Sequence, residues 1–379
     1  MLSLPYIALI MLLGALAFLY SYTSNQEHRG LLLSTGVIAF FFFFGFRGFI
    51  MSDWIIYYDF FYNCEFRDIF DFSFGTSKAF EPGFTILTLM CKALFEDYHF
   101  FVVIITAINT VLLLRFFSRY SDNILLCLML FVVFDGLSII VNLMRNSISI
   151  LIFLNALEYL TRRKPLQYFS LCLLAFTFHS SALVYFPLYF FFHLRPPRWL
   201  FLTIFIGFNI IYLLNIPIFA TFLSYAGFEG ETDKIIAYTE KFTSTSKLSI
   251  GYLERLLTCF LVLCYYNRLY EIRKGNGVFI NALLTYLMFL FVFSGFPVIG
   301  HRMGCLFAFA YWILWGDLIK CFFYENNRRL FATFVYLYCI LRIIGSTQLP
   351  DFEYDNVLFG AKSYEERLYI HNKTFEETF

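Results

Sequence analysis

The chain has 379 residues, of which 60% are hydrophobic, 22% aromatic and only 15% charged. Soluble domains are roughly 45 to 50% apolar, so this composition excludes an ordinary soluble protein and indicates a polytopic membrane protein. The formal net charge of +1 excludes nucleic acid as a partner, because proteins that bind DNA or RNA present strongly basic faces.

Apolar stretches that can cross or enter a bilayer follow one another along the chain. They cover residues 3–20, 31–46, 83–95, 100–117, 123–134, 137–160, 166–193, 198–222, 250–267, 278–296, 303–321 and 330–345. In lipid only a helix or a closed barrel satisfies the backbone, so we predict an all-α polytopic fold with roughly 11 to 13 transmembrane or re-entrant helices. The first stretch lacks a basic leader and a cleavage site, and we expect a retained span there, not a signal peptide.

Clusters of basic residues between the apolar stretches set the expected orientation. They are Arg115/Arg119, Arg162-Arg163-Lys164, Arg195/Arg198, Arg268/Arg273/Lys274 and Arg328-Arg329. Because basic loops stay in the cytoplasm, the turns between them should face outward. Two long outward loops, residues 47–82 and 216–249, are suited to interfacial helices that cover a cavity. We treat residues 1–345 as one membrane domain and expect the acidic tail, residues 346–379, on the same outward side.

Two apolar segments do not fit ordinary spans. Residues 166–193 lie between cytoplasmic flanks but are too short to cross twice, so we expect a tight or re-entrant hairpin with Phe178-His179-Ser180 at its outward tip. Residues 83–97 are also short. If residues 47–82 lie outside and Arg115 inside, residues 83–117 must cross the membrane an odd number of times. We expect this segment to dip into the membrane or lie along its surface.

The nine cysteines lie mostly within apolar stretches, and no pair has the C-x-x-C spacing of zinc or redox sites. They are interpreted as small buried side chains. No Asp-rich metal motif is visible either. We therefore expect neither a metal site nor a cofactor.

Ionisable side chains occur at or just inside the expected outward ends of the spans. A charge at the centre of an inserted helix costs roughly 2.5 to 3.5 kcal/mol, so such residues need a partner or a function. They are Arg47, Asp53, Glu81, Arg145, His179, Arg255, His301 and Arg302. Their convergence on one side predicts a water-filled cavity for an anionic ligand.

Several of these residues have simpler explanations. Arg47 and Arg302, at span ends, can extend to lipid headgroups. Asp53 and Glu81 can cap the helices that follow them. His179 can be a turn residue. These alternatives stay open at the level of sequence.

Arg145 is harder to explain in this way. Asn142, Asn146 and Ser149 flank it at i, i+4 and i+7 spacing, which on a continuous helix makes one polar face. Guanidinium groups pair bidentately with phosphate oxygens and stabilise the charge that develops on a leaving group. Departure of a polyprenyl pyrophosphate from a sugar is a reaction that needs such groups, and arginines would then take the place of a divalent ion.

That reaction also needs a base for the incoming hydroxyl. Asp53, Glu81 and His179 are the outward candidates. We favour Asp53, because it precedes aromatic residues, among them Tyr57, that can stack on sugars.

Four motifs occur in the order found in one known family. They are Gly45-Phe-Arg47-Gly48 with Asp53 and Tyr57, then Glu81-Pro82-Gly83-Phe84, then Arg145-Asn146 with Ser149, and then Phe178-His179-Ser180-Ser181-Ala182-Leu183. Over residues 30–195 this set resembles the EpsG-like branch of the Wzy-type O-antigen and exopolysaccharide repeat-unit polymerases. It departs at Asn146, where the family often has Gln, a change that keeps the neighbouring guanidinium.

The resemblance implies an inverting glycosyltransferase of the bacterial inner membrane with a GT-C-like fold. It would transfer a growing glycan from undecaprenyl pyrophosphate to the non-reducing end of a lipid-linked repeat unit, on the periplasmic face. Its expected partners are these lipid-linked glycans, the bilayer and a chain-length regulator protein. The residues expected to bind pyrophosphate or sugar are Arg47, Tyr57, Arg145, Asn146, Arg255, His301 and Arg302.

Two other functions remain open. A flippase or transporter for lipid-linked oligosaccharides should show repeated halves and charges in both leaflets, and neither pattern is visible. A membrane glycan acyltransferase or ligase would be favoured if His179 and a neighbouring acid formed the only essential pair. The sequence does not distinguish O-antigen, capsule and exopolysaccharide as the product.

Overall fold

The computed structural model describes residues 2–71, 80–219, 221 and 248–378. Within these ranges the regular structure is helical and no strand is present. The prediction of an all-α fold is therefore confirmed. Two predicted loops lie partly outside the described residues. These parts are most of the loop 216–249 and residues 72–79 of the loop 47–82. The chain divides into two compact units, residues 1–191 with 332–379, and residues 192–331. Each unit is described by itself.

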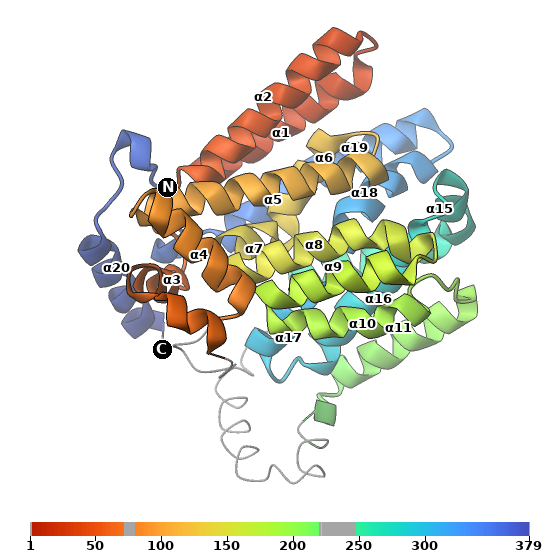
Figure 1. Cartoon of the computed structure of the whole chain (residues 1–379). Helices are drawn as coiled ribbons and strands as arrows, with labels where there is room; N and C mark the ends of the chain where they lie inside the picture. Colours follow the sequence, from red (N-terminus) through yellow and green to blue (C-terminus); the bar gives the residue numbers. More distant parts are fainter. Residues whose placement is uncertain (1, 72–79, 220, 222–247, 379) are drawn as a thin grey trace. The chain divides into compact units, whose positions relative to one another are not determined.

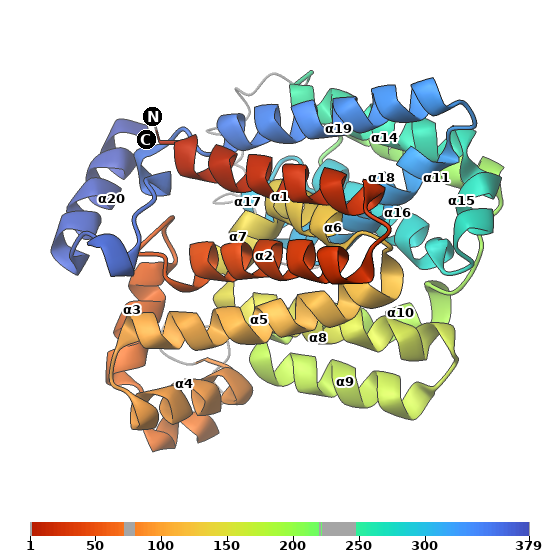
Figure 2. The ribbon, with the colours of Figure 1, turned by 90° about the horizontal axis from the view of Figure 1, so that it is seen from above.

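Long helices of the first unit lie side by side in a row. Figure 2 shows this row, in which each helix contacts the next. Its members are α1 (Leu4–Tyr22), α2 (Gln26–Gly45), α5 (Tyr98–Tyr120), α8 (Met144–Thr161) and α9 (Pro165–Phe178). Helix α8 runs between α5 and α9 (Figure 1) and is almost entirely buried.

Local sequence explains where these helices begin. The Asn25 side chain accepts hydrogen bonds from the backbone N–H groups of Glu27 and His28 at the start of α2. Asp97 accepts from Phe100 N in the same way at the start of α5. Such caps satisfy amides that have no partner within the helix. Proline needs no such partner, and Pro165 opens α9.

The predicted continuous span over residues 137–160 is wrong, because the chain breaks within it. Helix α6 (Ile124–Phe131) continues through a kinked turn into α7 (Leu137–Val141), and α8 starts afresh at Met144. Asp135 in the kink has a φ of 65°. Residues 124–141 together are long and apolar enough to cross a membrane.

Among the described residues, five helices have the length and hydropathy of a membrane span, or six if one bent pair counts as a single span. This confirms a multi-pass membrane protein. The spans are α1, α2, α5, residues 124–141 and α19 (Glu325–Ser346), and the bent pair is α17 with α18. Other predicted stretches form apolar helices of 10 to 17 residues, among them α4 (Pro82–Leu94) and α9. The predicted turn at His179 is confirmed, since α9 ends there and a short 3₁₀ turn and α10 (Tyr185–Phe191) follow.

The second unit is built around α16 (Asn276–Val292), which packs against α11 (Arg198–Leu213), α17 (Pro297–Cys305) and α18 (Phe309–Cys321). Helices α17 and α18 meet at a bend of 63°. Helix α14 (Ile250–Cys264) and α15 (Tyr266–Ile272) complete the unit.

The C-terminal tail packs on the first unit. Beyond α19, residues 350–357 pair with residues 46–51 through backbone hydrogen bonds, including Val357 N to Phe46 O (2.8 Å) and Gly48 N to Asp355 O (3.0 Å). The tail ends in α20 (Tyr364–Thr378). Figures 1 and 2 both show α20 at the same end of this unit as α3 (Trp54–Asn63). The side of the membrane on which the tail lies, and the division into a domain and a tail, stay predictions.

Candidate functional site

An ion pair between Glu81 and Arg145 forms the centre of the candidate site in the first unit. The Nη1 atom of Arg145 donates to Oε2 of Glu81 at 2.6 Å. The Glu81 side chain is 6% exposed and that of Arg145 is 22% exposed, so the guanidinium is the more accessible partner. Its Nε atom is buried and has no hydrogen-bond partner among the described residues. The pair therefore presents an oriented cation with unused donor capacity.

The Glu81-Pro82-Gly83 motif places this carboxylate. Pro82 opens α4, and Glu81 stands just before it, but the Glu81 side chain makes no capping hydrogen bond. Gly83 lies so close to α9 that an added Cβ would come within 2.5 Å of Thr177 Oγ1 and 2.8 Å of Thr177 O. The glycine thus allows α4 to approach the end of α9. The predicted capping role of Glu81 does not occur.

The turn at the end of α9 supplies a second contact for Glu81. The backbone N–H of Ser180 donates to Glu81 Oε1 at 2.9 Å. Burial raises the pKa of the Glu81 carboxyl, but Arg145, His179 and the Ser180 N–H outweigh burial, so that this pKa lies below its ordinary value. Glu81 is therefore an anion near neutral pH that holds Arg145, and a weak proton acceptor.

His179, Ser181 and Asn146 form a short chain of contacts beside this pair. His179 Nδ1 accepts from Ser181 N at 3.1 Å and lies 2.8 Å from Ser181 Oγ. Ser181 Oγ donates to Asn146 Oδ1 at 3.0 Å. Asn146 follows Arg145 directly, so this chain links the turn after α9 to the start of α8. It joins residues that the sequence places in two separate motifs.

Aromatic rings surround the guanidinium of Arg145. The Cζ atom of Arg145 lies 3.9 Å from the ring centroid of Phe80, a cation–π contact. Burial raises the pKa of Tyr57 on α3, and the charge of Arg145 together with a hydrogen bond to it opposes that shift. Arg145 and Tyr57 were predicted as site residues, whereas Phe80 was missed. Its position directly before Glu81 was the only signal in the sequence.

Asp53 is attached to the same region through Asn142. The Oδ1 atom of Asn142 accepts from Asp53 N (2.8 Å) and from Ser52 N (3.3 Å). Asn142 lies at the break between α7 and α8, so it does not share a helical face with Asn146 as the spacing predicted. Asp53 precedes α3 and lies one turn before Tyr57. The structure thus brings Asp53, Tyr57, Glu81, Arg145, Asn146 and His179 into one unit.

Arg47 has a different environment. It is 4% exposed, and its guanidinium donates to Phe44 O, to Thr106 Oγ1 (3.2 Å) and to Ile140 O (3.2 Å). These contacts fasten α2 to α5 and α7. They favour a structural role, and nothing in them supports the predicted contact with substrate.

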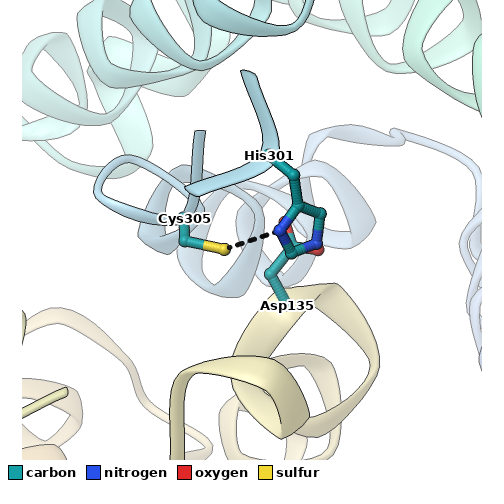
Figure 3. A group of neighbouring side chains, drawn as sticks. All are labelled: Asp135, His301 and Cys305. Atoms are coloured by element: carbon teal, nitrogen blue, oxygen red, sulfur yellow. Dashed lines mark hydrogen bonds between the residues drawn. The ribbon is translucent and has the colours of Figure 1, made fainter. Parts of the chain in front are cut away.

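Arg255, His301 and Arg302 belong to the second unit. Arg255 lies on α14, next to the buried Glu254, whose carboxylate accepts from Thr258 Oγ1 at 2.7 Å. His301 and Arg302 are exposed on α17. Figure 3 shows His301 above Cys305 on one side of this helix, with Nδ1 3.5 Å from Sγ. Asp135, also drawn there, belongs to the first unit and is described with it.

The family of the chain is shown by comparison with known proteins. The profile of the EpsG family matches residues 30–356, which include every predicted site residue and nearly the whole chain. No curated protein and no solved structure matches. The match extends well beyond the motifs before residue 195. The chain therefore belongs to the EpsG family, a Wzy-like family of polysaccharide polymerases.

Proposed function

We propose that this protein polymerises lipid-linked oligosaccharide repeat units. The growing glycan leaves undecaprenyl pyrophosphate and joins the non-reducing end of an incoming lipid-linked repeat unit, with inversion at the anomeric carbon. The observation that carries this proposal is the Glu81–Arg145 pair, an anchored and partly accessible guanidinium in a chain of the EpsG family.

Arg145 is the residue proposed to bind the pyrophosphate. As the bond to the anomeric carbon breaks, negative charge grows on the departing phosphate, and a fixed guanidinium stabilises it without having to reorganise. Glu81, Phe80 and Tyr57 hold that guanidinium in place. Glu81 is therefore proposed as a positioning residue, because its carboxylate already faces a cation.

Asp53 remains the proposed base. Its backbone is fixed by Asn142, and it precedes the helix that carries Tyr57. His179 is the second choice, since its Nδ1 atom already accepts from Ser181 N.

The site is proposed to face the periplasm of a bacterial inner membrane, within a GT-C-like fold. The basic residues Arg162 to Lys164 support this orientation, because they lie at the far end of α8 from Arg145. Single cysteines beside His179 and beside Arg163, in a background lacking reactive thiols, test it in intact cells. Labelling by a membrane-impermeant reagent beside His179 but not Arg163 is expected, and the reverse would refute the orientation.

The activity is tested with purified protein and a synthetic undecaprenyl-pyrophosphate-linked repeat unit. The wild type should convert it into a ladder of longer lipid-linked glycans. Arg145→Ala and Arg145→Lys should both slow extension by about 10² to 10³-fold, because lysine lacks the planar fork. Arg67→Ala is the control, since the Arg67 side chain is 81% exposed in the short 3₁₀ helix after α3. A normal ladder from Arg145→Ala at normal abundance would refute the assignment.

A further inference from the structure

A cleft of about 400 Å³ lies in the first unit, apart from the Glu81–Arg145 pair. Its walls come from Phe49 and the outer face of α3, from the start of α5, and from residues 357–364 of the tail. Pockets for small ligands commonly have volumes of about 300 to 1,000 Å³. The cleft therefore has room for a small organic ligand.

Aromatic rings form much of this cleft. Phe49 and Tyr98 are buried beneath it, with ring centroids 5.8 Å apart. Tyr58 and Tyr62 lie one turn apart on α3, and the Tyr364 ring lies 4.4 Å from that of Tyr58. Tyr58, Tyr62 and Tyr364 are only partly buried. Their ring faces and hydroxyls are thus available to a ligand that has both apolar and polar surface.

Charged and polar groups share the lining. Asp97 uses one carboxylate oxygen to cap α5, and Lys362 pairs with Glu353 of the tail. His99 also lines the cleft. A lipid acyl chain would leave these groups without partners, whereas a sugar offers hydroxyls to them and C–H faces to the rings. The chemistry of the lining therefore favours a saccharide.

Helix α3 connects the cleft to the proposed reaction site. Successive residues of a helix point about 100° apart. Tyr57 faces Phe80 and Arg145, and its neighbour Tyr58 lines the cleft. The cleft thus lies on another face of the helix that helps to hold Arg145.

We propose that this cleft binds a sugar residue of the glycan at a distance from the bond that is made. This inference rests on the proposed function and adds to it a saccharide subsite built in part by the C-terminal tail. Such a subsite would retain the glycan between successive transfers. Its loss should therefore shorten the polymer more than it slows a single transfer.

Binding is measured on the full-length protein in lipid nanodiscs. The probe is the one-repeat oligosaccharide released by mild acid from the organism's own lipid-linked repeat unit, so that it carries neither lipid nor phosphate. Saturation-transfer NMR should detect it on the wild type. Tyr364→Ala should weaken binding by about 3- to 10-fold, as expected for one lost aromatic contact. Tyr369→Ala is the control, because Tyr369 is on the same tail, 70% exposed and outside this cleft.

Asp97→Asn is a second test of the cleft, because Tyr364→Ala could weaken binding simply by detaching the tail. Asparagine caps a helix as well as aspartate does, so α5 should stay intact while the charged acceptor is lost. This variant should also bind the oligosaccharide about 3- to 10-fold more weakly. Both variants should join the first two repeat units at the wild-type rate but give a shorter ladder.

The outcomes separate this inference from the proposed function. Arg145→Ala should bind the oligosaccharide normally while failing to extend the lipid-linked repeat unit. Wild-type binding and ladders from both Tyr364→Ala and Asp97→Asn would refute the subsite and leave the polymerase proposal intact. A wild-type protein that binds the oligosaccharide, but does not extend the lipid-linked repeat unit, would refute the polymerase proposal alone.

Discussion

Arg47 and Arg145 lie in the same unit, yet their guanidinium groups meet opposite kinds of partner. Arg47 is surrounded by backbone carbonyls and a threonine hydroxyl, and is 4% exposed. Arg145 pairs with one carboxylate, stacks on one ring and stays 22% exposed. The atoms that receive an arginine's hydrogen bonds therefore tell more about its task than its position near a membrane boundary.

The same contrast extends to the surroundings of the two arginines. The backbone of Arg47 pairs with that of Asn356 in an isolated antiparallel β-bridge. The Tyr354 ring of the tail stacks on the Phe43 ring, with centroids 4.2 Å apart. That region is fastened from distant parts of the chain. Around Arg145 the contacts come instead from the turn at residues 179–181 and from α3. One region joins helices through buried contacts, and the other holds a cation that stays partly accessible.

Replacement of Arg47 by alanine should have the largest effect, the loss of folded protein. The buried carbonyl of Ile140 would lose its guanidinium donor, at about 1 to 3 kcal/mol, and Phe44 O would keep only Thr106 Oγ1 as a side-chain donor. Arg145→Ala should lose less folded protein than Arg47→Ala, because its site is partly open and the Glu81 carboxylate that it leaves can take up a proton. For both variants, size-exclusion chromatography measures the amount of folded protein and thermal unfolding measures its stability. A stable, monodisperse Arg47→Ala protein that cannot extend glycan would instead make Arg47 a substrate-binding residue.

Asp53→Asn should have the next largest effect, on turnover. One positioned base supplies about 10² to 10⁴ in rate, and the amide cannot accept the proton. The fold should persist, because Asn142 holds the backbone N–H of Asp53 and not its carboxylate. Extension of the synthetic lipid-linked repeat unit and binding of the donor are measured separately. Near-normal turnover by Asp53→Asn, with an inactive but folded His179→Ala, would move the role to His179.

Much of the fold was predictable, because hydropathy alone sets the length of the apolar helices. The break at His179 was also predictable, since the stretch between two basic flanks is too short for two spans. The break at residues 142–143 was not, because no local signal marks it, and the hydrogen bond that Asn142 Oδ1 accepts there comes from Asp53 N, 89 residues away. The docking of the tail depends on backbone pairing between segments about 300 residues apart.

The candidate site was predictable as a set of residues but not as a set of pairs. Glu81 and Arg145 stood out because each places a charge near hydrocarbon. Their ion pair joins positions 64 residues apart, and no local pattern indicates it. Spacing on one helix was a poor guide, since Asn142 and Asn146 serve different partners across the break. The aromatic cleft was not predicted, because the tail supplies one of its walls.

Glu81→Gln should lower the stability of the fold by an intermediate amount that depends on pH. The pKa of Glu81 is lower in the folded protein than its ordinary value of about 4.3. The charged carboxylate therefore stabilises the fold at a pH above that ordinary pKa. This stabilisation is lost as pH falls through the folded pKa. The unfolding temperature of the wild type should therefore exceed that of Glu81→Gln near pH 7, and the two should converge in acid. A difference that does not change with pH would show that the charge of Glu81 does not matter.

The smallest effects should come from two glycines, one in each region. At Gly83 a Cβ would come within 2.8 Å of the Thr177 carbonyl, which is backbone and can yield only if α4 moves away from α9. At Gly48 it would come within 2.0 Å of Asp355 Oδ1, in a tail held by an ion pair from Arg367. Overpacking of this kind costs about 1 to 3 kcal/mol. Gly83→Ala moves the start of the helix that follows Glu81, so it should slow glycan extension by a few-fold and also lower the unfolding temperature. Gly48→Ala should lower the unfolding temperature and expose the tail to protease while changing extension less. If instead both variants lose activity and stability in the same proportion, the two regions act as one, and the distinction between the buried Arg47 and the partly accessible Arg145 fails.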